Sequence, residues 1–256
     1  MKIYNLLFLL ITLLVCNSQV LSQSHRNKAE NYFGVQVKPL IPISVVGDRP
    51  FDITEDGFTS TISPIFGYSY GGIVRVGITD LLAIETGLNY IRRNYRANYS
   101  VADSNVYAED ELGYVSFEVP VNFLVYIKLG QQMFMNVSIG ASGNFNASNI
   151  RSQINPEGKH LFIFEGRRSR FFDFNANADV GFEYRTEKSG TFYLGLSGRV
   201  PFSPTLAIAT EYRYGTNKTV GFGVVEGSTF SLNLRYFFHN QNRKKGVQFQ
   251  NGPIEQ

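Results

Sequence analysis

Apolar and polar residues alternate with a period of two along most of the chain. In the stretch 115–127 every odd position is Val, Phe or Ile, whereas the even positions include Ser116, Glu118 and Asn122. In the stretch 172–184 the phase is opposite, and the odd positions include Asp173 and Asp179. Successive side chains of a β-strand point to opposite faces. The pattern therefore predicts strands with one apolar and one polar face.

Eight such strands are predicted, at residues 32–43, 62–78, 81–97, 114–127, 133–147, 171–185, 191–205 and 229–238. The connections at 79–80, 128–132 and 186–190 are short, whereas those near 44–61, 98–113, 148–170 and 206–228 are long. Within the last of these, 206–214 and 219–227 also alternate and predict a tall hairpin. Short turns on one side and long loops on the other are typical of bacterial outer-membrane barrels. The even strand number places both ends of the barrel on the short-turn, periplasmic side.

Alternation alone also fits a soluble β-sandwich, in which the apolar face packs on a core. Two features favour a membrane barrel. The predicted strands run to about 10–13 residues or more, longer than the usual five or six of globular sheets. Aromatic residues gather near both ends of the apolar faces, as in the interfacial girdles of such barrels. The predicted fold is all-β, an eight-stranded antiparallel up-and-down transmembrane β-barrel in the outer membrane of a Gram-negative bacterium.

Composition agrees with strands and turns. The 256 residues include 22 Phe, 15 Tyr and 24 Gly but no Trp, and only 18% are charged, below the roughly 25% usual in soluble domains. Aromatic residues favour strands, and glycines favour turns and bends. The net charge is +3, and no stretch has the density of basic residues that nucleic-acid binding needs. Nucleic acid is therefore not an expected partner.

The N-terminus predicts a secretory signal peptide at residues 1–22. Lys2 precedes an apolar stretch, 6–15, that is too short for a transmembrane helix. Cleavage is expected before Gln23. The single cysteine, Cys16, could instead be a lipidation site, although Val15 is a poor residue to precede one. The predicted organisation is a signal peptide (1–22), a barrel (23–238) and a flexible periplasmic tail (239–256).

The polar face carries balanced charge, with five cations and five anions. They are Lys38, Arg75, Arg93, Arg199 and Arg235 against Glu85, Glu118, Asp173, Asp179 and Glu183. The interior of an eight-stranded barrel has room for side chains and little else. Charges confined there must pair, because unpaired buried charge is costly. The sequence therefore predicts an ion-pair network that plugs the lumen. The alternative is a solvated surface of mixed charge.

A second basic group lies where strands meet the long loops: Arg92, Arg96, Arg167, Arg168 and Arg170. Arginine suits phosphate because its planar fork binds two oxygens at once. Contact with lipopolysaccharide or with a partner is one interpretation. An ordinary charged rim in water is the other.

Four segments carry a resemblance to a known family. They are LLAIETGLNYIRRNY (81–95), YVSFEVPVNFLVYI (114–127), DVGFEYR (179–185) and FSLNLRYFF (230–238). Over about 32–238 the chain resembles the PorT-like outer-membrane β-barrels of Bacteroidetes, although Tyr114 and Glu118 stand two residues further apart than usual. The resemblance implies a role in secretion or envelope assembly. The last strand also resembles the signal that the barrel assembly machinery reads, with Asn233 where glycine is usual.

Little in the chain indicates catalysis. His25, His160 and His239 are far apart, and none has a serine two residues later, as barrel lipid-A deacylases do. They are expected to be solvated surface residues, and no metal, cofactor or catalytic residue is predicted. The leading hypothesis is a non-enzymatic barrel with a structural, binding or accessory role. A small-solute channel is the alternative, and an enzyme acting on lipid A or peptides is disfavoured.

Overall fold

A computed structural model describes residues 31–42, 48–102, 104, 106–186 and 188–239. The predicted signal peptide and positions 240–256 of the predicted tail lie outside the described residues. The strands are β1 (Asn31–Ile41), β2 (Phe51–Glu55), β3 (Phe58–Gly77), β4 (Leu82–Val101), β5 (Val106–Lys128), β6 (Met133–Asn146), β7 (Ile150–Ile154), β8 (His160–Arg168), β9 (Phe172–Arg185), β10 (Thr191–Pro201), β11 (Leu206–Tyr214), β12 (Asn217–Val225) and β13 (Thr229–Phe237). A short 3₁₀ turn, η2 (Pro156–Gly158), joins β7 to β8. No helix in the described part of the chain is long and apolar enough to cross a membrane.

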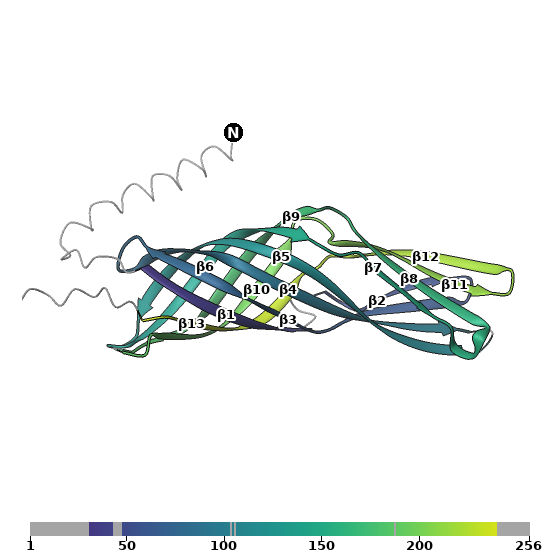
Figure 1. Ribbon diagram of the computed structural model, residues 1–256, viewed down its shortest axis with the longest axis horizontal. Coiled ribbons are helices and arrows are strands. Elements are labelled where there is room, and N and C mark those ends of the chain that lie inside the picture. Colours follow the sequence, from purple (N-terminus) through teal and green to yellow (C-terminus); the bar gives the residue numbers. More distant parts are fainter. Residues whose placement is uncertain (1–30, 43–47, 103, 105, 187, 240–256) are drawn as a thin grey trace, which may run out of the picture.

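Eight of these strands close into a ring. They pair antiparallel in the order β1-β13-β10-β9-β6-β5-β4-β3, and β3 pairs back with β1. Each ring strand lies beside the ring strand that follows it in the sequence, so the connectivity is up-and-down (Figure 1). The eight correspond to the eight strands predicted from alternation. The all-β barrel fold is therefore confirmed.

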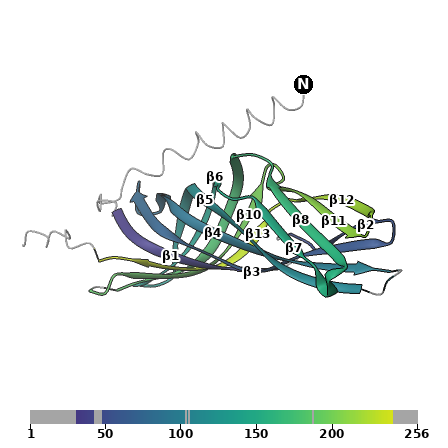
Figure 2. The same ribbon diagram turned by 45° about the vertical axis from the view of Figure 1, so that its right-hand side comes forward.

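The predicted long loops are mostly strands, which corrects the description of 44–61, 98–113 and 148–170 as loops. The hairpin predicted at 206–214 and 219–227 is confirmed by β11 and β12. β4 continues to Val101 and β5 begins at Val106, so this hairpin rises well beyond the barrel. β2 pairs with the first part of β3, and β12, β11, β8 and β7 form a second sheet in that order. The strands β2, β7, β8, β11 and β12 form what we call the distal module. It also includes the parts of β3, β4 and β5 at 58–65, 94–101 and 106–113. Figures 1 and 2 show it extending the barrel on the side away from the three short turns.

The two sheets of the distal module meet by packing. β2 lies beside β12, and β5 beside β7, with no ladder pairing between them among the described residues. Phe51 and Ile53 of β2 press against Gly223 and Gly221 of β12, where any Cβ atom would clash. A Cβ atom at either position would push these side chains aside, so the two glycines favour the close approach of the sheets.

The two faces of β4 exchange their chemistry half-way along the strand. Within the ring, the inward positions include Glu85 and Asn89, while the exposed ones include Leu88. Beyond Arg92 the inward positions are Tyr95 and Ala97 and the other odd residues up to 101, and the outward positions are polar. The odd positions point inward along the whole strand, so the exchange reflects a change in what surrounds the strand. The ring is apolar outside and polar inside, whereas the distal module has the polarity of a water-soluble β-sandwich.

An apolar belt surrounds the ring. Its exposed side chains include Val35, Val37, Val74, Leu88, Val119, Val121, Phe123, Ile139, Val180, Phe182, Leu194, Leu196 and Leu234. Aromatic rings border it on both sides: Tyr68, Tyr70, Tyr90 and Phe117 form one cluster near the distal module, and Phe33, Phe192, Tyr236 and Phe238 form another near the short turns. Such a belt with aromatic girdles is the surface that a barrel presents to lipid.

The interior of the distal module is a packed aromatic core. Phe162 stacks on Tyr99 with 5.1 Å between ring centroids and on Tyr212 at 5.2 Å. Phe58 completes the stack, 5.6 Å from Tyr212. His160 joins it, because its Nδ1 lies 2.7 Å from the Tyr212 hydroxyl and its ring is buried. The expectation of a solvated His160 is therefore wrong. Its inward parity on β8, shared with Phe162, places it in the core.

Candidate functional site: the charged lumen

The centre of the lumen is a chain of ion pairs that crosses from one wall to the other. Arg75 of β3 and Glu85 of β4 are direct neighbours in the hairpin ladder. Arg75 donates to Glu85 Oε2 from Nε at 3.1 Å and from Nη2 at 2.9 Å. Its Nη1 lies 2.5 Å from Oε2 of Glu183, on β9 across the barrel. The guanidinium also lies over the ring of Phe237, 4.1 Å from its centroid.

Arg235 of β13 extends this chain. Its Nη1 lies 3.0 Å from Oε1 of Glu85, and its Nη2 lies 2.6 Å from Oδ2 of Asp179. Asp179 also accepts hydrogen bonds from the Tyr193 hydroxyl and the Asn233 side chain. Each carboxylate therefore has several donors, which is what buried charge requires.

A second, smaller cluster surrounds Glu118. Arg199 donates from Nη1 to Oε1 of Glu118 at 3.2 Å. The same carboxylate accepts from Ser142 Oγ at 2.8 Å and from Asn89 Nδ2 at 3.2 Å. The three partners come from β10, β6 and β4, so this cluster also connects different walls of the barrel.

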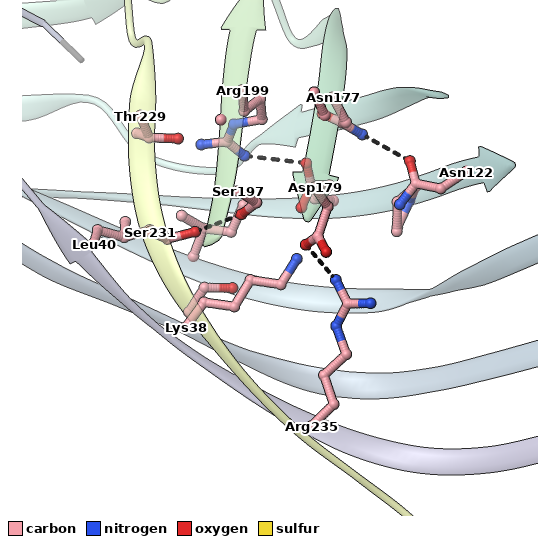
Figure 3. Close-up of a pocket in the computed structure, with 16 residues that line it drawn as sticks. Lys38, Leu40, Asn122, Asn177, Asp179, Ser197, Arg199, Thr229, Ser231 and Arg235 are labelled. Carbon is pink, nitrogen blue, oxygen red and sulfur yellow. Dashed lines mark hydrogen bonds and ion pairs between the residues drawn. The ribbon is translucent and has the colours of Figure 1, made fainter. Parts of the chain in front are cut away.

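The ten charged residues predicted for the lumen point inward, and nine of them are buried. These nine are Arg75, Glu85, Arg93, Glu118, Asp173, Asp179, Glu183, Arg199 and Arg235, whereas Lys38 is half-buried. Three of the ten form no ion pair among the described residues. Asp173 instead accepts from Ser203 Oγ at 2.7 Å. Arg93 lies over the Tyr114 ring at 5.4 Å, and none of its three guanidinium nitrogens has a hydrogen-bond partner among the described residues. Lys38 borders a small cavity (Figure 3).

Two members of the network were missing from the sequence prediction. Arg185 lies at the short-turn end of β9 and donates from Nε to Glu183 Oε1 at 2.6 Å. Tyr193 of β10 lies beneath the guanidinium of Arg235, 4.5 Å from its ring centroid. Both share the inward parity of their strands, since Arg185 follows Glu183 by two residues. Parity could therefore have identified Arg185, whereas a tyrosine fits either face.

The second predicted group of arginines lies on the outside. Arg92, Arg167 and Arg170 are exposed, and Arg96 bridges to Glu109 at 3.0 Å and Glu111 at 2.8 Å on the neighbouring strand. Arg167 lies 3.5 Å from Glu165. Arg168 is bound to the protein itself, because its Nη1 donates to the carbonyls of residues 146 and 147 and its guanidinium lies 3.7 Å from the Phe171 ring centroid. Arg92 donates from Nε to Asn94 Oδ1 on its own strand at 3.2 Å. Arg92 and Arg170 are the exposed members that form no ion pair among the described residues.

No cluster of three or more metal-ligating side chains occurs among the described residues.

Comparison with known proteins identifies the family. A family model described as outer membrane protein beta-barrel domain matches residues 21–205. No curated protein matches the chain significantly.

Among solved structures, the outer membrane protein OprG of Pseudomonas aeruginosa is 11% identical with a TM-score of 0.48, covering 83% of this chain and 97% of that one. The outer membrane protease OmpT of Escherichia coli is 9% identical with a TM-score of 0.39, covering 86% and 100%. An outer membrane channel of Pseudomonas putida is 12% identical with a TM-score of 0.23, covering 85% and 99%. With the family model covering most of the chain, the protein belongs to the outer membrane β-barrel domain family, in the outer membrane of a Gram-negative bacterium.

Proposed function

We propose that this protein is a non-conducting, non-enzymatic barrel that holds its distal module at the cell surface, as an envelope or secretion accessory of the PorT-like kind. The observation that carries the proposal is that both halves of the interior are filled. Ion pairs fill the ring, and an aromatic core fills the distal module. A solute would have to break both in order to pass.

The ion-pair chain opposes conduction on energetic grounds. Glu85 accepts from Arg75 and Arg235 together, and both of their guanidinium groups are almost fully buried. Removing one member of a buried pair leaves an uncompensated charge, which costs about 3–5 kcal/mol. Several such contacts would have to open at once for a continuous water path. The network therefore favours a structural role for the lumen.

A binding role is supported by the distal module. It is a packed sandwich rather than a set of loops, so it can present a fixed surface. Arg92 and Arg170 lie outside the barrel at the edge of the apolar belt, the level of lipid headgroups in this topology. We propose that they contact lipopolysaccharide phosphates or an envelope protein partner. The barrel assembly machinery would read the final strand, in which Tyr236 and Phe238 face outward.

The absence of an enzymatic role is also part of the proposal. His160 is bound to the Tyr212 hydroxyl inside the aromatic core, where it has no access to a substrate. The carboxylates of the lumen are each held by cations, amides or hydroxyl groups. These groups serve the packing of the interior.

A small-solute channel is the second candidate, and one observation favours it. The lumen contains a polar cavity of about 40 Å³ beside Lys38. That is room for about three water molecules. A channel would need this cavity to connect to both ends of the barrel.

Electrical recording in planar lipid bilayers distinguishes the two candidates. The mature protein is expected to give no unitary current steps. Insertion into the bilayer is verified separately, by the heat-modifiable gel mobility of protein recovered from the same lipid, so that the absence of current is not a failure to insert. Regular steps from the unaltered protein would favour the channel and contradict the proposal.

A further inference from the structure

The cavity beside Lys38 has an unusual charge balance. Three cationic side chains line it, Lys38, Arg199 and Arg235, and two carboxylates, Glu118 and Asp179. The neutral lining includes the hydroxyls of Ser197 and Ser231 and the amides of Asn122 and Asn177. Figure 3 shows the Lys38 side chain reaching into the space between Ser197, Asp179 and Arg235.

Both carboxylates are already engaged by other donors. Asp179 binds Arg235, Tyr193 and Asn233. Glu118 binds Arg199, Ser142 and Asn89. Lys38 forms no ion pair with either one, and none with any other described residue. Arg235 is shared between Asp179 and Glu85, so Lys38 is the cation of the lining that has no counter-charge in contact among the described residues.

Several hydrogen-bond donors around the cavity also have no acceptor among the described residues. Nε and Nη2 of Arg199 and Nε of Arg235 are buried with no hydrogen-bond partner among the described residues. Arg93 lies near enough to Arg199 for the two guanidinium groups to repel each other, and its three nitrogens are also unpartnered among those residues. Water can satisfy hydrogen-bond donors, but it brings no compensating charge. A buried cation without a counter-charge is costly, so this region would be stabilised by an anion.

We propose that the cavity binds one small inorganic anion of halide size. The anion would lie beside the Lys38 ammonium, with the Arg199 guanidinium and the serine hydroxyls as further donors. A volume of about 40 Å³ accommodates a chloride ion with part of its hydration. The proposal is independent of whether the barrel conducts, because an anion needs access to the cavity but no continuous water path through the barrel.

The first test measures the temperature at which the detergent-folded mature protein loses its compact gel mobility. Sodium chloride is compared with sodium gluconate at equal ionic strength, since gluconate is too large for the cavity. Ligand binding to the folded state alone stabilises it, so chloride is expected to raise the midpoint in a saturable manner, by about 2–4 °C. Lys38→Met removes the unpaired charge at similar length. This variant is expected to lose the chloride response and to be more stable than the unaltered protein in gluconate.

Lys188→Met is the matched control, because it makes the same substitution at an exposed lysine on a short turn and should keep the chloride response. An equal response in the Lys38→Met variant and the unaltered protein would mean a general salt effect and would overturn the proposal. A response to sulfate but not to chloride would overturn the assignment of halide size.

The second test uses the unaltered protein and so does not depend on the folding of a variant. Crystals soaked in sodium bromide are expected to show an anomalous scattering peak in the cavity beside Lys38. Clear density for the lining side chains without such a peak would contradict the proposal.

Discussion

Tyr95 donates a 2.9 Å hydrogen bond to Oδ2 of Asp48, joining the base of the distal module to the connection that precedes β2. The other carboxylate oxygen of Asp48 accepts from the backbone nitrogens of Gly227 at 2.7 Å and Ser228 at 2.9 Å. This one side chain therefore holds together the connections before β2 and after β12, far apart in the sequence. Burial raises the pKa of Asp48 above its usual value of 3.8, against the opposing effect of these donors.

The raised pKa predicts that Asp48 contributes more to folding stability at low pH than at neutral pH. A carboxyl group with a higher pKa in the folded state holds its proton more tightly there than in the unfolded chain. Its contribution is fully present below pH 3.8 and is lost as the pH rises through the folded-state pKa. Asp48→Asn keeps an oxygen acceptor for Gly227 and Ser228 but cannot ionise. We expect the variant to remove this component from the pH dependence of the unfolding midpoint, measured from about pH 3 to about pH 7. Identical pH profiles for the two proteins would contradict the role of Asp48.

The aromatic core predicts that the distal module can be weakened without loss of the barrel. Phe162 is buried against Tyr99 and Tyr212. Replacing it with alanine should cost the module about 3–5 kcal/mol, because a cavity remains in the core. Protease added to intact cells should cut the variant within the module, while the membrane-embedded part keeps its heat-modifiable gel mobility. Phe222→Ala is the control, since this side chain is 77% exposed and should be replaced without increased cutting. Equal resistance of Phe162→Ala would argue against a packed module.

The proposed topology can be tested by labelling. The only cysteine of the chain, Cys16, lies in the predicted signal peptide, so an introduced cysteine would be the single thiol of the mature protein. Arg167→Cys should react with a membrane-impermeant maleimide on intact cells. Lys188→Cys, on a short turn, should react only after the outer membrane is permeabilised. Labelling in the reverse order would invert the topology.

The strands of the ring, and the residues that pair across its short hairpins, could be predicted from the sequence. A short turn at 79–80 fixes which residues of β3 and β4 are opposite each other, and this is how Arg75 meets Glu85. The pair between Arg235 and Glu85 was not accessible, because it crosses the lumen and depends on the curvature of the whole ring. One sequence contains no measure of that curvature.

The distal module was only partly predicted because its alternation has the opposite chemistry. Apolar residues that face outward predict this strand only as far as Ala97, although Tyr99 and Val101 continue the same inward-pointing positions. The same change of surroundings explains why His160 is buried. Its side chain points into the interior, which is polar within the ring and apolar within the distal module. A strand that passes from lipid to water must exchange the chemistry of its faces, and the point of exchange marks the membrane boundary.

The pair of Glu118 and Arg199 provides the sharpest test of the filled lumen. Both side chains are buried, and Arg199 Nη1 lies 3.2 Å from Glu118 Oε1. Glu118→Leu leaves the Arg199 guanidinium buried near Arg93 with no counter-charge, so we expect a loss of about 3–5 kcal/mol in the free energy of unfolding. Arg199→Met leaves the carboxylate with Ser142 and Asn89 alone and should also destabilise. The double variant should cost less than the sum of the two, because neither charge is stranded.

Denaturant unfolding in lipid vesicles gives the free energies for this cycle. The matched control is the exposed pair of Arg96 and Glu111, 2.8 Å apart on the outside of the distal module. Solvent screens that pair, so the same cycle with leucine at both positions should be close to additive. Additivity at Glu118 and Arg199 as well would mean that water reaches both charges, and a lumen open to water is a condition that conduction through this barrel requires.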